Sequence, residues 1–153
     1  MVYTVNVGDG NTDGTAIGSN TPGEIWIGKA NDNGDHTQDG RPFASRPASL
    51  KFWYKYAPHQ SETFVVNVVL KDAGGNVIAN VTESTLGKQS RWTQHELPIV
   101  YDVEDSRAAS LYISFKSAAS GKVQVAKTIE VAGSDQKAHI GSVLRIDDIE
   151  LTY

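Results

Sequence analysis

The chain has 153 residues and a net charge of −4, from 14 lysines and arginines against 18 aspartates and glutamates. No basic cluster stands out, which argues against nucleic-acid binding through phosphates, and the absence of cysteine excludes disulfides, thiolate zinc sites and thiol catalysis. No apolar run is long enough to span a membrane. We expect residues 1–153 to form one domain, and this domain could equally be a fragment of a longer multidomain protein.

The first elements are short and separated by polar loops. Apolar and polar residues alternate over residues 3–7, which predicts a strand with one buried face. A loop rich in glycine, aspartate and asparagine follows over residues 8–21, before a short apolar strand over residues 25–27. Residues 29–40 are polar, and the two prolines in residues 41–47 predict an extended connection.

The middle of the chain carries the clearest strand patterns. Residues 50–56 alternate, with the aromatic face buried and the lysine face exposed. Residues 64–71 are apolar on both faces except for Asn67, which is the pattern of a central strand. A turn over residues 73–76 predicts a hairpin with residues 77–82.

Later strands are predicted over residues 92–101, 111–115 and 123–131, and a last strand closes the chain. Valine and isoleucine outnumber leucine, and branching at Cβ favours strands over helices. The sequence therefore predicts an all-β fold, a two-sheet antiparallel β-sandwich of jelly-roll type.

Alternation slips by one residue in the last strand. Leu144 and Ile146 share one face, whereas Ile149 and Leu151 have the opposite parity. Either both faces are buried there, or a β-bulge at Asp147–Asp148 absorbs the extra residue and re-aims the two carboxylates. We favour the bulge.

Three blocks of sequence carry a family resemblance. They are GRPFASRPASLKFWYKYAP (40–58), WTQHELPIVYD (92–102) and GSVLRIDDIELTY (141–153). Together they resemble the carbohydrate metabolism domain family of Bacteroidetes cell-surface proteins, over residues 25–153. The resemblance implies a galactose-binding-like jelly roll at the extracellular or outer-membrane surface, acting in polysaccharide metabolism beside other surface-protein domains.

Calcium is the cofactor for which the sequence offers candidate binding residues. Asp9 and Asp13 lie in a loop that fits the first half of a calcium-binding loop, although Asn20 replaces the bidentate glutamate of an EF-hand. A solvated turn is the favoured alternative, and residues 31–35 are interpreted in the same way. Similar jelly rolls hold a structural Ca²⁺ through an acid of the last strand, which implies Asp148 with Asp9 or Asp13. Alternatively, Asp148 accepts backbone N–H bonds or forms an ion pair.

A glycan site needs an aromatic face and planar polar groups. Trp53 is the candidate platform because it lies on the lysine face of its strand; the alternative is a tryptophan covered by a loop or by lysine stems. Trp26 and Trp92 are expected in the core. Arg46 could bind a sugar acid or hold its own connection through a local acid, and His59 could line a site or be a solvated loop residue.

Catalysis has little support in the sequence. Asp147 and Asp148 point to opposite faces of a regular strand, which disfavours them as a glycosidase pair, and no nucleophile elbow, zinc-protease or phosphate-loop motif occurs. We predict a non-catalytic carbohydrate-binding or adhesion module whose partner is a glycan or polysaccharide. The alternative is a structural or protein-interaction domain of a surface assembly, and a glycoside hydrolase is the least favoured.

Overall fold

The structure is a computed structural model that describes residues 2–5, 22–30, 36–119, 127–130 and 137–153. Within these residues every regular element is a β-strand and every pairing is antiparallel. The strands are β1 (Val2–Val5), β2 (Glu24–Ile27), β3 (Lys29–Ala30), β4 (His36–Thr37), β5 (Arg41–Pro42), β6 (Ser49–Ala57), β7 (Val65–Lys71), β8 (Val77–Glu83), β9 (Gln89–Pro98), β10 (Ser110–Lys116), β11 (Lys127–Glu130), β12 (Lys137–Ile140) and β13 (Val143–Thr152).

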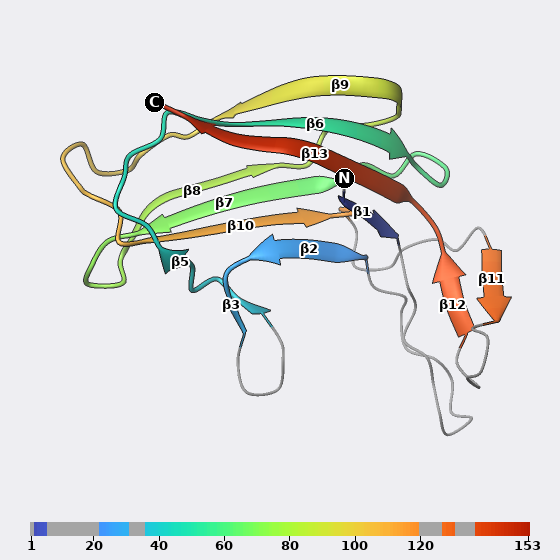
Figure 1. Cartoon of the computed structure of the whole chain (residues 1–153), viewed down its shortest axis with the longest axis horizontal. Coiled ribbons are helices and arrows are strands. Elements are labelled where there is room, and N and C mark those ends of the chain that lie inside the picture. The colour runs from blue at the N-terminus through green and yellow to red at the C-terminus, as the bar shows by residue number, and fades with distance from the viewer. Residues whose placement is uncertain (1, 6–21, 31–35, 120–126, 131–136) are drawn as a thin grey trace.

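Two sheets form the layers of the molecule (Figure 1). The four-stranded sheet has the order β1-β13-β6-β9, and the five-stranded sheet has the order β2-β10-β7-β8, with β5 also paired to β10. The chain passes from one sheet to the other between β6 and β7, between β8 and β9, and between β9 and β10. Connections that cross repeatedly between two antiparallel sheets are typical of β-sandwiches, jelly rolls among them, so the predicted β-sandwich is confirmed.

The core lies between the sheets and is built by strict alternation. On β6, Leu50, Phe52, Tyr54 and Tyr56 are each at most 4% exposed, which confirms the predicted buried face. Phe52 packs edge-on against Phe115 of the opposite sheet, with ring centroids 5.0 Å apart. Burial of such side chains supplies the main favourable term in folding, at about 25 cal/mol per Å² of apolar surface.

The polar segment after β2 contains structure that its sequence did not predict. β3 and β4 form a two-stranded ribbon through Lys29 and Thr37, and β5 pairs with one end of β10. Pro42 is tolerated in β5 because this strand lies at the edge of the sheet. The ribbon and β5 therefore bring the segment before β6 onto the five-stranded sheet (Figure 1).

The predicted bulge in the last strand is confirmed. Asp147 lies opposite Trp53 and Glu150 lies opposite Lys51, so two residues of β13 face one residue of β6. Asp148 takes the left-handed conformation, with φ of 47°. The shift turns Leu151 toward the core, whereas Ile149 stays 42% exposed.

Candidate functional site

A groove of 460 Å³ lies on the outer face of the five-stranded sheet, across β8, β7 and β10. Its volume falls within the range of about 300–1,000 Å³ that is usual for ligand sites. Most of its lining side chains carry amide or hydroxyl groups. They are Gln38, Val65, Asn67, Asn80, Thr82, Ser84, Tyr112, Ser114, Lys116 and Ala119.

Strand alternation places these polar side chains on one surface. Val66 and Val68 are fully buried in the core, so Asn67 between them points outward. Asn67 lies opposite Ser114 of β10 on one side and opposite Thr82 of β8 on the other. Residues that face each other in a sheet point to the same side, which gathers three hydrogen-bonding side chains in one row.

Asn67 is the centre of a hydrogen-bond network in the groove. Its amide nitrogen donates to Asn80 Oδ1 at 2.9 Å, to Thr82 Oγ1 at 2.9 Å and to the Val81 carbonyl at 3.1 Å. Within the described residues, its Oδ1 accepts one long bond, at 3.5 Å, from Gln38 Nε2. These contacts fix the amide so that its acceptor side faces Gln38. The Thr82 hydroxyl hydrogen and the Asn80 amide group are then left to donate elsewhere.

Two ion pairs balance the charge on this face of the sheet. Lys116 Nζ lies 3.7 Å from Glu24 Oε1, and Lys71 Nζ lies 2.9 Å from Asp39 Oδ1. The hydrogen bond and the positive charge of Lys71 lower the pKa of Asp39. Both acids come from segments outside β7 and β10, namely β2 and the turn after β4.

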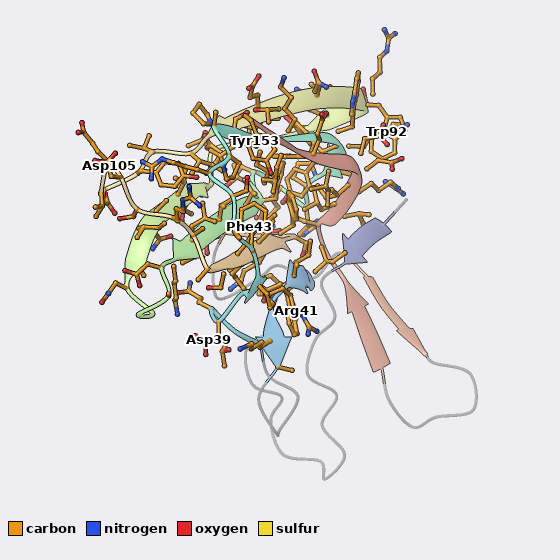
Figure 2. All side chains as sticks on the ribbon, turned by 60° about the vertical axis from the view of Figure 1, so that its left-hand side comes forward. Asp39, Arg41, Phe43, Trp92, Asp105 and Tyr153 are labelled. Atoms are coloured by element: carbon orange, nitrogen blue, oxygen red, sulfur yellow. The ribbon has the colours of Figure 1, made fainter. Side chains whose placement is uncertain are left out.

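Gly40 allows that turn to lie directly against β10. A Cβ atom at this position would be 2.2 Å from the carbonyl carbon and oxygen of Leu111, so no side chain fits there. The close approach brings Gln38 to the groove, and Asp39 follows it in the same turn, beside Arg41 of β5 (Figure 2).

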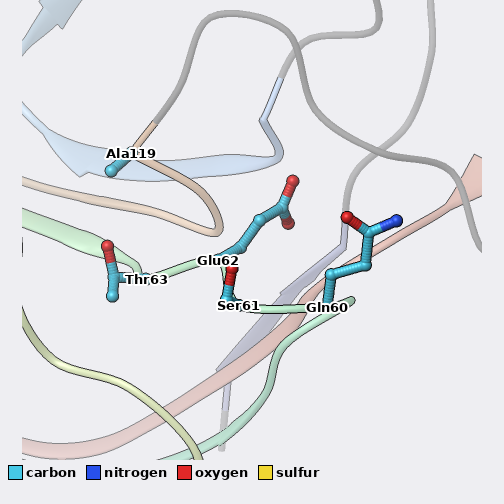
Figure 3. Close-up of a pocket in the computed structure, with 5 residues that line it drawn as sticks. All are labelled: Gln60, Ser61, Glu62, Thr63 and Ala119. Atoms are coloured by element: carbon cyan, nitrogen blue, oxygen red, sulfur yellow. The ribbon is translucent and has the colours of Figure 1, made fainter.

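A second cavity of 280 Å³ lies at the loop between β6 and β7 (Figure 3). It is lined by Gln60, Ser61, Glu62, Thr63 and Ala119. Gln60 and Glu62 project to the same side of the loop (Figure 3). The Ser142 hydroxyl donates to Glu62 and accepts from the His59 backbone N–H. Because Ala119 lines both cavities, the second cavity adjoins one end of the groove.

Trp53 faces away from the core, as predicted, and is 36% exposed. It lies on the four-stranded sheet, between Gln94 of β9 and Asp147 of β13, on the opposite side of the sandwich from the groove.

The expectation that Trp26 and Trp92 lie in the core is wrong, because both are half-buried on outer faces. Trp92 is covered by Lys55, whose Nζ lies 5.1 Å from the ring centroid, and Trp26 lies opposite Ser114 beside the groove.

Arg46 holds a loop through backbone carbonyls, which the sequence did not predict. Its guanidinium donates to the Ser106 carbonyl at 2.7 Å and to the Val103 carbonyl at 3.1 Å. It also stacks on Tyr101, 3.8 Å from the ring centroid. The partners of Arg46 within the described residues are therefore backbone carbonyls and an aromatic ring rather than a local acid, and binding of a sugar acid by Arg46 stays a prediction.

The three residues predicted to bind the glycan do not form one site. Arg46 precedes β6 and His59 follows it, so they lie at opposite ends of a nine-residue strand, about 30 Å apart at the usual rise per residue. Trp53 lies midway between them. His59 is half-buried and contributes its backbone N–H to Ser142.

Asp148 is exposed, and its backbone N–H donates to Asp147 Oδ1 at 3.1 Å. The carboxylate therefore does not need a partner to offset burial. Asp9 and Asp13 lie outside the described residues, as does the loop over residues 31–35. Among the residues that the structure describes, no cluster of three or more histidine, aspartate or glutamate side chains could hold a metal ion. Calcium binding through Asp148 stays a prediction.

Sequence reasoning missed the groove, although one signal pointed to it. Asn67 was the only polar residue within the apolar run of residues 64–70. A polar amide in an otherwise apolar central strand needs hydrogen-bond partners. The presence of Asn67 therefore indicates a functional or structural hydrogen-bond network. Nothing in the sequence indicated that Asn67 contacts Asn80, Thr82 and Gln38, because their proximity depends on how distant segments pair.

The fold and the groove define the chain as a two-sheet jelly-roll domain with a polar surface site. It is similar to a Bacteroides thetaiotaomicron protein proposed to be a glycoside hydrolase, with a TM-score of 0.62, 17% identity, and coverage of 88% of this chain and 48% of that one. The chain thus spans about half the length of that protein, and the similarity shows a shared fold.

Other similarities are more distant. A CBM4 structure matches with a TM-score of 0.34 and 11% identity, over 97% of this chain and 92% of that one. An arabinose-bound GH51 α-L-arabinofuranosidase matches with a TM-score of 0.38 and 14% identity, over 95% and 22%. Neither score is high enough to support an argument. No family model and no curated protein matches the chain. In the described part of the chain, no helix has the length and apolar character to cross a membrane.

Proposed function

We propose that this domain is a non-catalytic carbohydrate-binding module and that the groove on its five-stranded sheet holds a glycan or polysaccharide. The observation that carries the proposal is the amide and hydroxyl network around Asn67. Sugar hydroxyls both donate and accept hydrogen bonds, and a surface that presents both kinds of group in fixed positions matches them.

The shape and chemistry of the groove favour binding over hydrolysis. The groove crosses three neighbouring strands, which suits an extended chain more than a compact molecule. Glycoside hydrolysis requires two carboxyl groups on either side of the scissile bond. The described residues that line the groove include no carboxyl group.

A role in a larger protein follows from the same proposal. The similar Bacteroides protein is about twice as long as the matched region, so the domain would act as the binding part of a longer polysaccharide-processing protein. Such a protein would work at the extracellular or outer-membrane surface, where its polymer is found. A structural Ca²⁺ held by Asp148 with Asp9 or Asp13 would stabilise the domain without taking part in the groove.

The test is a binding screen against neutral and acidic polysaccharides, run with calcium and again with EDTA. We expect Asn67→Leu to weaken binding by at least about tenfold, equivalent to about 1.4 kcal/mol, because it removes the centre of the network. Asn80→Ala and Gln38→Ala, at exposed positions, should weaken it less while leaving the fold intact. Thermal unfolding checks that each variant is folded.

Trp53→Ala is the matched control, since Trp53 lies on the opposite sheet. It should bind as the wild type does. Loss of binding in Trp53→Ala, with Asn67→Leu unaffected, would move the glycan site to the four-stranded sheet and contradict the proposal.

A second candidate function is a protein-interaction domain of a surface assembly. It is favoured by exposed apolar side chains at one end of the sandwich, where Val100 is 69% exposed and Tyr153 is 75% exposed. The two lie close together because Ala48 bonds to both Ile99 and Thr152 through its backbone. A folded sample that binds no polysaccharide in the screen would favour this candidate.

A further inference from the structure

Resting on the proposed function, we propose that the groove selects uncharged glycan chains, and that Glu24 is the residue that excludes acidic ones. The argument begins with the cation at the groove. Lys116 is the only positively charged side chain among the lining residues that the structure describes. An acidic sugar would need this ammonium group as the partner of its carboxylate or sulfate.

Glu24 already occupies the position of such a partner. Its Oε1 lies 3.7 Å from Lys116 Nζ, and its side chain is only 16% exposed, against 41% for Lys116. Glu24 is held in place by the pairing of β2 with β10, in which it lies directly opposite Lys116. The lysine charge is therefore neutralised from within the protein, by an acid that is less accessible than the lysine itself.

A second ion pair repeats the arrangement further along the same face. Lys71 points outward from β7, as Asn67 does, and Asp39 lies 2.9 Å from its Nζ. Both lysines that β7 and β10 present on this face are thus matched by an acid from another segment. An anionic ligand in the groove would therefore find no unpaired lysine on β7 or β10. The carboxylates of Glu24 and Asp39 lie outside the groove lining but beside these lysines, and they would repel a like charge bound there.

An uncharged glycan chain would not experience this electrostatic repulsion. Its hydroxyl groups can accept from the Thr82 hydroxyl and the Asn80 amide, and can donate to Asn67 Oδ1, whose contact with Gln38 is 3.5 Å long. Neutral recognition by the Asn67 network and charge exclusion by Glu24 are therefore separate properties of the same groove. Separate variants can test each of them.

The experiment measures dissociation constants for matched pairs of hexasaccharides, one neutral and one built of the corresponding uronic acid. The pairs are galactose with galacturonate and mannose with mannuronate. For wild-type protein we expect a neutral member to bind at least about tenfold more tightly than its acid, at about 50 mM salt. Glu24→Gln keeps the shape of the side chain and removes its charge, so it should narrow this ratio several-fold by improving the binding of the acid.

Three controls make the result specific. Glu150→Gln changes the net charge equally on the opposite sheet, and should leave the ratio unchanged. Raising the salt to about 500 mM should cancel the gain in Glu24→Gln, because the gain is electrostatic. Lys116→Met should bind the acid no better than the wild type, and it provides a second test if Glu24→Gln does not fold.

Each outcome bears on a different claim. Wild-type protein that binds the acidic member as tightly as the neutral one would overturn the inference and leave glycan binding intact. An unchanged ratio in folded Glu24→Gln would show that Glu24 is not the excluding residue. Failure of every hexasaccharide to bind folded protein would overturn both the inference and the proposed function.

Discussion

At the scale of single residues, Arg46 shows how one side chain can hold a loop. It is the common partner of two backbone carbonyls and of the Tyr101 ring, and Tyr101 in turn donates to the Pro47 carbonyl at 2.9 Å. Charged hydrogen bonds of this kind contribute more than neutral ones. The Arg46 guanidinium, the Tyr101 hydroxyl and the backbone bond from Ile99 to Ala48 therefore join the segment before β6 to the segment after β9.

Arg46→Met keeps much of the aliphatic stem and removes both hydrogen bonds. We expect the free energy of unfolding to fall by about 1–3 kcal/mol, because one partly buried hydrogen bond, one exposed hydrogen bond and a ring contact are lost. Urea unfolding measures the change. Arg107→Met, at an exposed position, is the control and should stay within about 0.5 kcal/mol of the wild type. Equal losses in the two variants would contradict the structural role of Arg46.

At the scale of elements, the bulge in β13 depends on the conformation of Asp148. A left-handed φ is costly for most side chains, less so for aspartate, and least for glycine. We expect Asp148→Gly to be at least as stable as the wild type and Asp148→Val to be less stable by about 1–2 kcal/mol. Both values come from urea unfolding.

Glu150→Val is the matched control for the bulge, since Glu150 is exposed and has returned to regular pairing with Lys51. Valine fits an ordinary strand position well, so this variant should lose little stability. If valine were tolerated equally at positions 148 and 150, the bulge would not depend on the backbone of Asp148.

At the scale of the whole molecule, buried and partly buried tyrosines link stability to alkaline pH. Burial raises the pKa of Tyr56 from 10.0 to about 12, and it raises the pKa values of Tyr54, Tyr101 and Tyr112 as well. In the unfolded chain these groups lose their protons first. Their contribution to stability is therefore complete below about pH 10 and is lost as pH rises toward about 12.

The free energy of unfolding should thus fall steeply between about pH 10 and pH 12, and urea unfolding across this range measures the slope. Tyr56→Phe should reduce the slope, because one titrating group is removed from the core. Tyr153→Phe is the control, at a side chain that is 75% exposed. A slope that is the same in wild-type protein and Tyr56→Phe would contradict the assignment of this titration to Tyr56.

Much of the fold could be predicted from local patterns. The alternation in residues 50–56 identified the buried face of β6, and the apolar run of β7 identified a central strand. The change of parity between Ile146 and Leu151 identified the bulge. Side chains alternate with a period of two in any strand, so these predictions needed no knowledge of the neighbouring strands. The ribbon of β3 and β4 was missed because its residues have no such alternation.

The candidate site depended on contacts between distant segments. Trp53 was correctly predicted to face outward, since its direction follows from its own strand. Alternation could not show that two other candidate residues, Arg46 and His59, lie at opposite ends of β6 with Trp53 between them. Asn67 meets Thr82 only through the pairing of β7 with β8, and meets Gln38 only because Gly40 fits against Leu111.

The amino-acid sequence was thus sufficient to predict the class of fold, the buried face of each clear strand, the bulge and the absence of thiol chemistry. Each of these follows from residue identity or from the period-two geometry of a single strand. Only the tertiary structure decided which strands are neighbours, that Trp26 and Trp92 lie on outer faces, and where a polar groove forms. Strand pairing and sheet stacking bring together residues that lie far apart in the sequence, and the charge balance between Lys116 and Glu24 exists only once β2 has docked on β10.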